Sequence, residues 1–284
     1  MQLRKVLLEN EKGQQFDMND YKRSCLLTSP SGLGYSNSSE FEQLGNIFIE
    51  NNKKIDKKDL AGVVNFRSYD NCKKFIDFIE RSEKIKFVYI TPINNSNKTY
   101  YKDVSIKEFD KTEKKIKTLA CPIKFNGLSL WYEQITTIYK IEPQSDEIRW
   151  DFKWDSKFSD YDTRSLQYIN NGHIEAPILV EIDGHVVNPC IELYVEGQLY
   201  QTVKFNVEIG EYEKLLYGTK EDEFYINKQK SDGTLESLFS LDVIEFENDN
   251  VIRLPKNKSC EIRLKADNEI LNAQITVLTY YKAV

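Results

Sequence analysis

The sequence predicts a mostly-β protein of two domains, the first of which carries a single α-helix. Tyrosine occurs 17 times and phenylalanine 15 times among 284 residues, against two methionines. Aromatic side chains suit the half-buried, pleated surface of a sheet. In the second half, short apolar segments recur about every ten residues between turn residues, which is typical of a β-sandwich or jelly roll. Only residues 70–83 show the apolar spacing of a helix.

The length of the chain indicates two domains. It exceeds the usual domain size of roughly 100 to 200 residues. We expect the boundary near Pro143, because the polar stretch Gln144-Ser145-Asp146-Glu147 interrupts the apolar pattern there. The predicted domains are therefore residues 1–143 and residues 144–284, and each is long enough to bury its own hydrophobic core.

The first domain begins with a predicted hairpin and contains the helix. Extended runs at residues 3–8 and 15–18 flank a turn at Lys12-Gly13. Residues 29–36 hold one proline and two glycines, which marks a loop. Ser68 or Asp70 can cap the helix that follows. Its apolar residues are spaced i, i+3, i+4 and i+7, so one stripe should lie buried on a sheet; they are Cys72, Phe75, Ile76 and Ile79.

A long hairpin is predicted after the helix. Two extended runs, residues 85–91 and 99–109, flank a polar tip at residues 92–98 that is too long for a tight turn. A hairpin that projects beyond its own domain offers unpaired edges and exposed tyrosines to a neighbouring subunit. The candidate interface residues are Tyr89, Tyr100, Tyr101 and Val104. The alternative is an ordinary hairpin inside one sandwich.

The second domain is predicted to contain only strands. Its turns carry pairs such as Asp183-Gly184, Glu196-Gly197 and Asp232-Gly233. We expect strands at residues 178–182, 191–195, 200–209, 222–226, 240–246, 250–254, 260–264 and 273–281. This number of short strands with this punctuation predicts a sandwich or jelly roll.

Charge and composition argue against several classes of protein. A net charge of -6 and an isoelectric point near 5.3 oppose general nucleic-acid binding. The mean hydropathy is -0.55, and no apolar run approaches the roughly 20 residues that span a bilayer. The first residues lack the apolar core of a signal peptide. We therefore expect a cytosolic protein without a membrane partner, whose five cysteines are reduced.

The sequence offers no catalytic constellation. The only histidines, His173 and His185, follow Gly172 and Gly184 and are expected on exposed turns. No G-x-S-x-G nucleophile turn occurs. Gly32-Leu33-Gly34 lacks the third glycine of a dinucleotide fingerprint. We therefore expect no enzymatic activity, no cofactor and no metal.

An aromatic strip near the domain boundary supports an alternative function. Trp150, Phe152 and Trp154 alternate along one predicted strand and so share a face. Such a face can be part of a core or an inter-domain contact. It can also stack on sugars, so that Trp150 and Trp154 would contact glycans in a carbohydrate-binding module or adhesin.

Four segments taken in order carry a family resemblance. They are residues 28–36 (TSPSGLGYS), 74–83 (KFIDFIERSE), 100–104 (YYKDV) and 129–132 (SLWY). Together they resemble the N-terminal half of the distal tail protein family of siphophages that infect low-GC Gram-positive bacteria, or of tailocins derived from such phages. The resemblance covers about residues 1–140.

The resemblance implies a structural role at the tip of a virion tail. It implies an N-terminal sandwich with one helix and a long hairpin, six copies of which close into a ring. It also implies a galectin-like C-terminal domain. Such a hub, assembled in the host cytoplasm, joins the tail tube protein to a tail-associated lysin, fibre or receptor-binding protein. DNA would be only cargo in its central channel.

Overall fold

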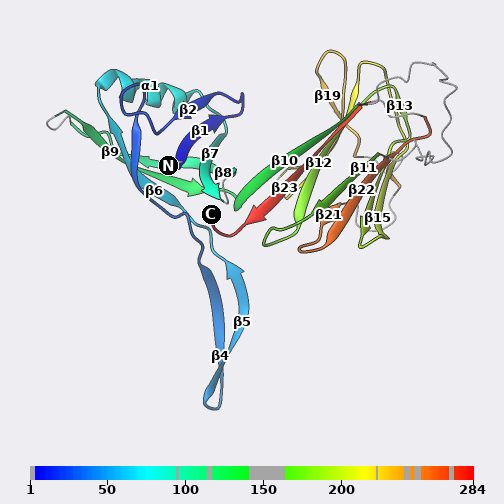
Figure 1. Ribbon diagram of the computed structural model, residues 1–284, viewed down its shortest axis with the longest axis horizontal. Coiled ribbons are helices and arrows are strands. Elements are labelled where there is room, and N and C mark those ends of the chain that lie inside the picture. The colour runs from blue at the N-terminus through cyan, green and yellow to red at the C-terminus, as the bar shows by residue number, and fades with distance from the viewer. Residues whose placement is uncertain are drawn as a thin grey trace, which may run out of the picture. The chain divides into compact units, whose positions relative to one another are not determined.

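The chain divides into two compact units (Figure 1). The computed structural model describes residues 4–93, 96–113, 117–140, 164–221, 223–239, 244–245, 251–268 and 272–284. Unit 1 comprises Met1–Glu133 and Tyr280–Val284, and unit 2 comprises Gln134–Thr279. The chain passes between them within β10 (Trp131–Lys140) and β23 (Asn272–Tyr281). The predicted boundary at Pro143 lies outside the described residues.

Unit 1 is built on antiparallel strands paired in the order β2-β1-β7-β8-β9-β6-β3. The hairpin predicted at the start of the chain is confirmed, and Gly13 donates its N–H to the Asn10 carbonyl in the turn at 3.0 Å. The bounds are β1 (Lys5–Asn10), β2 (Gln15–Asp17), β3 (Leu26–Ser31), β6 (Leu60–Phe66), β7 (Ile85–Ile93), β8 (Ser96–Phe109) and β9 (Leu119–Gly127).

The predicted helix is confirmed as α1 (Tyr69–Glu80). Ser68 caps it, because its Oγ accepts a hydrogen bond from the Asn71 N–H at 3.2 Å. Phe75 is fully buried, and its ring lies 5.3 to 5.4 Å from the rings of Phe16, Phe66 and Phe109. This aromatic cluster fastens α1 to the sheet. No helix in the described residues is long and apolar enough to cross a membrane.

Lys102 on β8 places a charged side chain in the interior of unit 1. The residue is only 2% exposed. Its Nζ donates to the Ser129 carbonyl at 2.7 Å and lies 5.6 Å from the centre of the Trp131 ring. Burial lowers the pKa of Lys102 to about 8, although the negative charges of Asp103 and Asp59 act in the opposite direction.

The hairpin that projects from unit 1 is formed by β4 (Asn37–Leu44) and β5 (Ile47–Ile55), and it extends far from the rest of the unit (Figure 1). Within the part of the chain that the structure describes, these strands pair with each other and with no further strand. The hairpin predicted from residues 85–109 is confirmed, since β7 pairs with β8 from Ile85 opposite Val104 to Ile93 opposite Ser96, but it is not the hairpin that projects. Residues 85–109 lie in the main sheet instead.

The base of the projecting hairpin is firmly fixed to unit 1. The Asp59 carboxylate accepts hydrogen bonds from Lys107 Nζ at 2.8 Å and from the Gly127 N–H at 3.3 Å. The first of these bonds contributes most to holding the pKa of Asp59 below its usual value. A Cβ at Gly32 would lie 2.0 Å from the Asp59 carbonyl oxygen, and one at Gly127 would lie 2.2 Å from the Lys58 carbonyl oxygen. Only glycine permits backbone contacts this close.

The described part of unit 2 contains two large antiparallel sheets and the small two-stranded sheet β13-β16, and its described regular elements are all strands. One large sheet includes β19-β18-β17-β12-β23, and the other has the order β11-β22-β14-β15-β20. The bounds are β11 (Arg164–Ile169), β12 (Ala176–Asp183), β13 (Val186–Val187), β14 (Cys190–Val195), β15 (Gln198–Phe205), β16 (Glu208–Ile209), β17 (Lys214–Lys220), β18 (Glu223–Gln229), β19 (Leu235–Ser237), β20 (Ile244–Glu245), β21 (Arg253–Leu254) and β22 (Ser259–Lys265).

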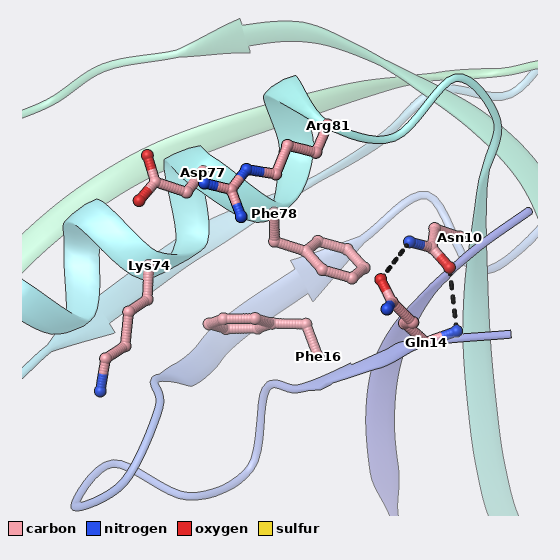
Figure 2. Close-up of a pocket in the computed structure, with 7 residues that line it drawn as sticks. All are labelled: Asn10, Gln14, Phe16, Lys74, Asp77, Phe78 and Arg81. Carbon is pink, nitrogen blue, oxygen red and sulfur yellow. Dashed lines mark hydrogen bonds between the residues drawn. The ribbon is translucent and has the colours of Figure 1, made fainter. Parts of the chain in front are cut away.

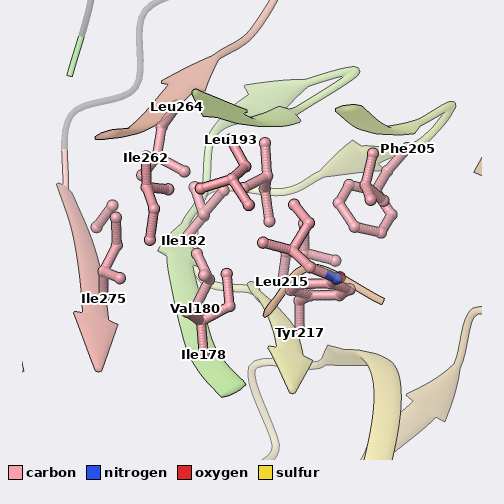
Figure 3. Close-up of a cluster of buried hydrophobic side chains, with 14 of the residues drawn as sticks. Ile178, Val180, Ile182, Leu193, Phe205, Leu215, Tyr217, Ile262, Leu264 and Ile275 are labelled. Atoms are coloured by element: carbon pink, nitrogen blue, oxygen red, sulfur yellow. The ribbon is translucent and has the colours of Figure 1, made fainter. Parts of the chain in front are cut away.

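The core of unit 2 is formed by side chains from both sheets (Figure 3). Val180 and Tyr217 from the first sheet pack in one buried cluster with Leu193, Phe205 and Ile262 from the second. All five are at most 1% exposed. Two sheets that share one apolar core form a β-sandwich. The predicted mostly-β fold is thus confirmed, whereas the galectin-like topology stays a prediction.

Replacing Gly127 by alanine should lower the free energy of unfolding of unit 1 by about 1–3 kcal/mol. The added Cβ would lie 2.2 Å from the Lys58 carbonyl oxygen and 2.8 Å from Lys102 Cε. Calorimetric unfolding of the full chain measures the loss. Gly34→Ala is the matched control, because a Cβ there meets nothing within 4 Å, and it should stay within about 0.5 kcal/mol of the parent. Equal losses for both variants would contradict the close approach.

Lys102 should make the stability of unit 1 rise between about pH 8 and pH 10.5. Its pKa is lowered from 10.5 to about 8 by burial. In this interval the unfolded chain binds a proton that the folded chain does not, so a rise in pH favours folding. Lys102→Met should abolish this contribution, whereas Lys73→Met on the exposed side of α1 should keep it. Urea unfolding at several pH values measures the difference, and parallel curves for parent and Lys102→Met would exclude the effect.

Candidate assembly surface

The structure places three of the four predicted interface residues inside unit 1. Tyr89, Tyr100 and Val104 are 8%, 6% and 2% exposed. The Tyr89 ring lies 6.2 Å from the ring of Trp131, and the Tyr100 ring meets that of Tyr281 edge-on at 5.4 Å. The expectation that these tyrosines are exposed is therefore wrong, because residues distant in the sequence cover them.

The fourth residue, Tyr101, also has a partner within unit 1. Its ring stacks on that of Tyr132 at 5.7 Å between centroids. The edges of the β7–β8 hairpin are occupied as well, since β1 pairs with β7 and β9 pairs with β8. An occupied edge cannot accept a further strand. The assignment of an interface to these four residues stays a prediction, without an exposed surface in this chain to support it.

Trp150 and Trp154 lie outside the described residues. His173 and His185 are exposed in bends between strands, as predicted. His185 Nε2 lies 3.0 Å from the Glu208 carboxylate in an exposed pair.

The exposed apolar residues of unit 1 gather at the end of the β4–β5 hairpin. We call residues 40–50 the hairpin tip. Its large apolar side chains are between 40% and 69% exposed; they are Phe41, Leu44, Ile47, Phe48 and Ile49. Single exposed apolar residues are ordinary, but a contiguous group of them marks an interaction site. The hairpin tip is therefore the candidate functional surface.

Both faces of the hairpin tip are apolar. Residues directly opposite each other in an antiparallel pair share a face, and neighbours along a strand alternate. The register pairs Leu44 with Ile47, and Ile49 follows on the same face. Phe41 and Phe48 occupy diagonally adjacent positions on the opposite face. A hairpin that lies flat on one surface buries only one of its two faces. Burial of both apolar faces requires that the hairpin insert between two surfaces.

The hairpin tip is also negatively charged. Glu40, Glu42 and Glu50 fall within it, and no lysine or arginine does. Glu50 lies opposite Phe41, on the phenylalanine face. Its carboxylate accepts hydrogen bonds from Ser39 Oγ at 2.6 Å and Lys53 Nζ at 3.2 Å. These bonds lower the pKa of Glu50.

A pocket lies on the outer side of α1, where the helix meets the β1–β2 hairpin (Figure 2). We call it the α1 pocket. Its volume is about 340 Å³. The half-buried rings of Phe16 and Phe78 lie 5.6 Å apart within it. The lining residues are Asn10, Gln14, Phe16, Lys74, Asp77, Phe78 and Arg81.

The wall of the α1 pocket on the β1–β2 side is held in one conformation. Asn10 is 5% exposed, and its Nδ2 donates to Gln14 Oε1 at 3.0 Å. Its Oδ1 accepts from the Gln14 N–H at 2.9 Å (Figure 2) and from the Lys12 N–H at 3.1 Å. These bonds use both ends of the Asn10 side-chain amide within the β1–β2 hairpin. The pocket is a preformed recess with an aromatic floor.

Sequence reasoning missed both the hairpin tip and the α1 pocket. The signal for the tip was present in Ile47-Phe48-Ile49, three consecutive apolar residues that break the alternation expected of a half-buried strand. The pocket had no comparable signal. It depends on the approach of Phe16 to Phe78, which lie 62 residues apart in the sequence.

Residues 5–128 match the family model of the distal tail protein, N-terminal domain. No curated protein matches the sequence. Among solved structures, the chain is similar to a protein of the phage P2 baseplate in its activated conformation with calcium, with 16% identity, a TM-score of 0.68 and full coverage of both chains. The same baseplate with strontium gives a TM-score of 0.67, again at 16% identity and full coverage.

The chain is also similar to the Dit protein of phage SPP1, described as a paradigm of the hub adsorption apparatus in phages that infect Gram-positive bacteria. The identity is 12%, the TM-score is 0.54 and the coverage is 98% of both chains. These likenesses show a shared fold over the two units. Residues 5–128 thus form an N-terminal domain of the distal tail protein family, and the chain carries this domain at its start.

Proposed function

We propose that this protein forms the hub at the tip of a phage tail and acts by assembly, not by catalysis. Six copies close into a ring, the number that the family resemblance implies. The ring joins the tail tube protein to a tail-associated lysin, fibre or receptor-binding protein. Its centre leaves a channel through which DNA passes as cargo.

The hairpin tip is the observation that carries this proposal. Full burial of a large apolar side chain contributes roughly 1.5–3 kcal/mol. Five such side chains are exposed at the tip, and a two-stranded hairpin alone is only marginally stable in water. A hairpin of this kind gains its stability when another protein covers it. The chain is thus built to be one part of an assembly.

The position of the hairpin favours a closed ring. Figure 1 shows that it leaves unit 1 on the side away from α1. A contact between this hairpin and another part of a second copy is heterologous, meaning that it joins two different surfaces. Heterologous contacts produce rings when the rotation between copies closes, and filaments when it does not. A tail with a central channel requires the ring.

The solved relatives support a location at the tail tip. One is part of a phage baseplate, and another is described as a hub of an adsorption apparatus. Both align with nearly the whole chain, so the proposal covers both units. The galectin-like sandwich implied for residues 144–284 is a further part of the proposal.

Replacing Phe41 and Phe48 by serine should convert the assembled protein to monomers. Central aromatic residues of an interface each contribute about 2 kcal/mol or more when truncated, and both are more than 60% exposed in the isolated chain. Native mass spectrometry and light scattering measure the mass. Tyr212→Ser, which removes an aromatic residue that is 77% exposed in unit 2, should leave the assembly intact. Rings that persist in the double serine variant would refute the role of the hairpin.

A further inference from the structure

We propose that the α1 pocket of one copy receives the phenylalanine face of the hairpin tip from a second copy. This inference rests on the proposed function, because it names the surface that completes each contact in the ring. It assigns a single occupant to the recess beside α1. The donor side consists of Phe41, Phe48 and Glu50, and the receiving side consists of Phe16, Phe78, Lys74 and Arg81.

The apolar parts of the two surfaces match. The pocket floor presents the edges and faces of two half-buried rings, Phe16 and Phe78. Aromatic pairs favour edge-to-face or offset contacts, and such pairs contribute beyond the area that they bury. The volume of about 340 Å³ lies at the lower end of the roughly 300–1,000 Å³ of ligand pockets. A recess of this size suits one or two inserted side chains.

The charges are complementary as well. Lys74 on α1 and Arg81, the residue that caps its C-terminus, lie seven residues apart and line the pocket on one side of the helix. Both cations are exposed, and neither makes an ion pair among the described residues. Asp77 is the one carboxylate among the lining residues, and its carboxylate is directed away from the two rings (Figure 2). The pocket rim is therefore net positive.

On the donor side, the phenylalanine face carries the matching carboxylate. Glu50 lies directly opposite Phe41 in the hairpin register, so its side chain shares that face. In the proposed contact, Glu50 exchanges its exposed ion pair with Lys53, at 3.2 Å, for the rim formed by Lys74 and Arg81. Glu42 lies opposite Ile49, on the other face of the tip. Only Glu50 is therefore expected to pair with the rim.

The two surfaces cannot meet within one chain. The hairpin extends from unit 1 away from α1 (Figure 1), so its tip and the pocket lie on opposite sides of the same unit. A second copy is the occupant that carries the required face. This head-to-tail arrangement repeats from copy to copy, as a heterologous ring interface requires.

A charge reversal with rescue tests the proposal. Lys74→Glu together with Arg81→Glu should raise the concentration needed for assembly at least about tenfold, since like charges across an interface strongly oppose association. Adding Glu50→Arg to the same chain should restore assembly. Adding Glu42→Arg instead should not restore it, because that side chain lies on the other face. Light scattering over a concentration series reads out the mass, and circular dichroism checks that each variant is folded.

The outcomes separate this inference from the proposed function. Lys73→Glu, an exposed change on α1 outside the pocket lining, should assemble like the parent. If the pocket reversal also assembles like the parent while the double serine variant of the tip does not, the hairpin tip binds elsewhere and the inference is overturned. Assembly like the parent is also expected of the pocket reversal if the α1 pocket binds a different tail protein, and in that case too the inference is overturned. A parent chain that stays monomeric at every concentration would refute the ring itself and this contact with it.

Discussion

An apolar hairpin tip held out in water is the constraint on which the rest of unit 1 depends. Its large side chains are 40% to 69% exposed, and no strand beyond its own two pairs with it in the described residues. Such a surface is costly for a free monomer, because the hydrophobic contribution is lost and the strand edges invite aggregation. The proposed assembly would remove this cost by covering the tip.

The base of the hairpin shows how the chain limits this cost. Asp59 joins the base to Lys107 and to the backbone of Gly127, and two glycines allow the main chain to pack at contact distance. These contacts fix the base from which the tip would be presented to a partner in the proposed assembly. Less conformational entropy is then lost on binding, which is the general advantage of a preorganised interface. The rigid core below, with Phe75 at its centre, carries this fixed geometry.

Apolar spacing, helix caps and turn residues in the sequence were sufficient to predict α1 and many of the strands. The spacing of Cys72 and Phe75 and the cap at Ser68 defined α1, and turn residues marked many strands of unit 2. Tertiary contacts decided the remainder. Strand β17 was missed although Leu215 and Tyr217 are fully buried, because no turn pair marked its start.

The choice between the two hairpins was also decided by tertiary contacts. Both contain aromatic residues and charges, and the sequence does not reveal which one a distant segment covers. Tyr100 is covered by Tyr281, which lies 181 residues further along the chain. No segment of the described chain covers Phe48 in this way, and it is 69% exposed. Exposure thus depends on the whole fold, and the broken alternation of Ile47-Phe48-Ile49 was the one local sign of it.

The arrangement of charge on the tip explains how a surface of this kind can remain selective. Three glutamates are interspersed with the apolar residues, and like charges on every copy oppose contact between two tips. Acidic residues beside exposed strands act in this way against edge-to-edge aggregation. The same carboxylates favour a basic partner surface, so repulsion and recognition come from one set of residues. Because the aliphatic face formed by Leu44, Ile47 and Ile49 remains uncovered when the phenylalanine face is bound, a single contact leaves half of the tip in water. Full burial requires a second surface, and an interface that needs two surfaces at once favours the complete assembly over isolated pairs.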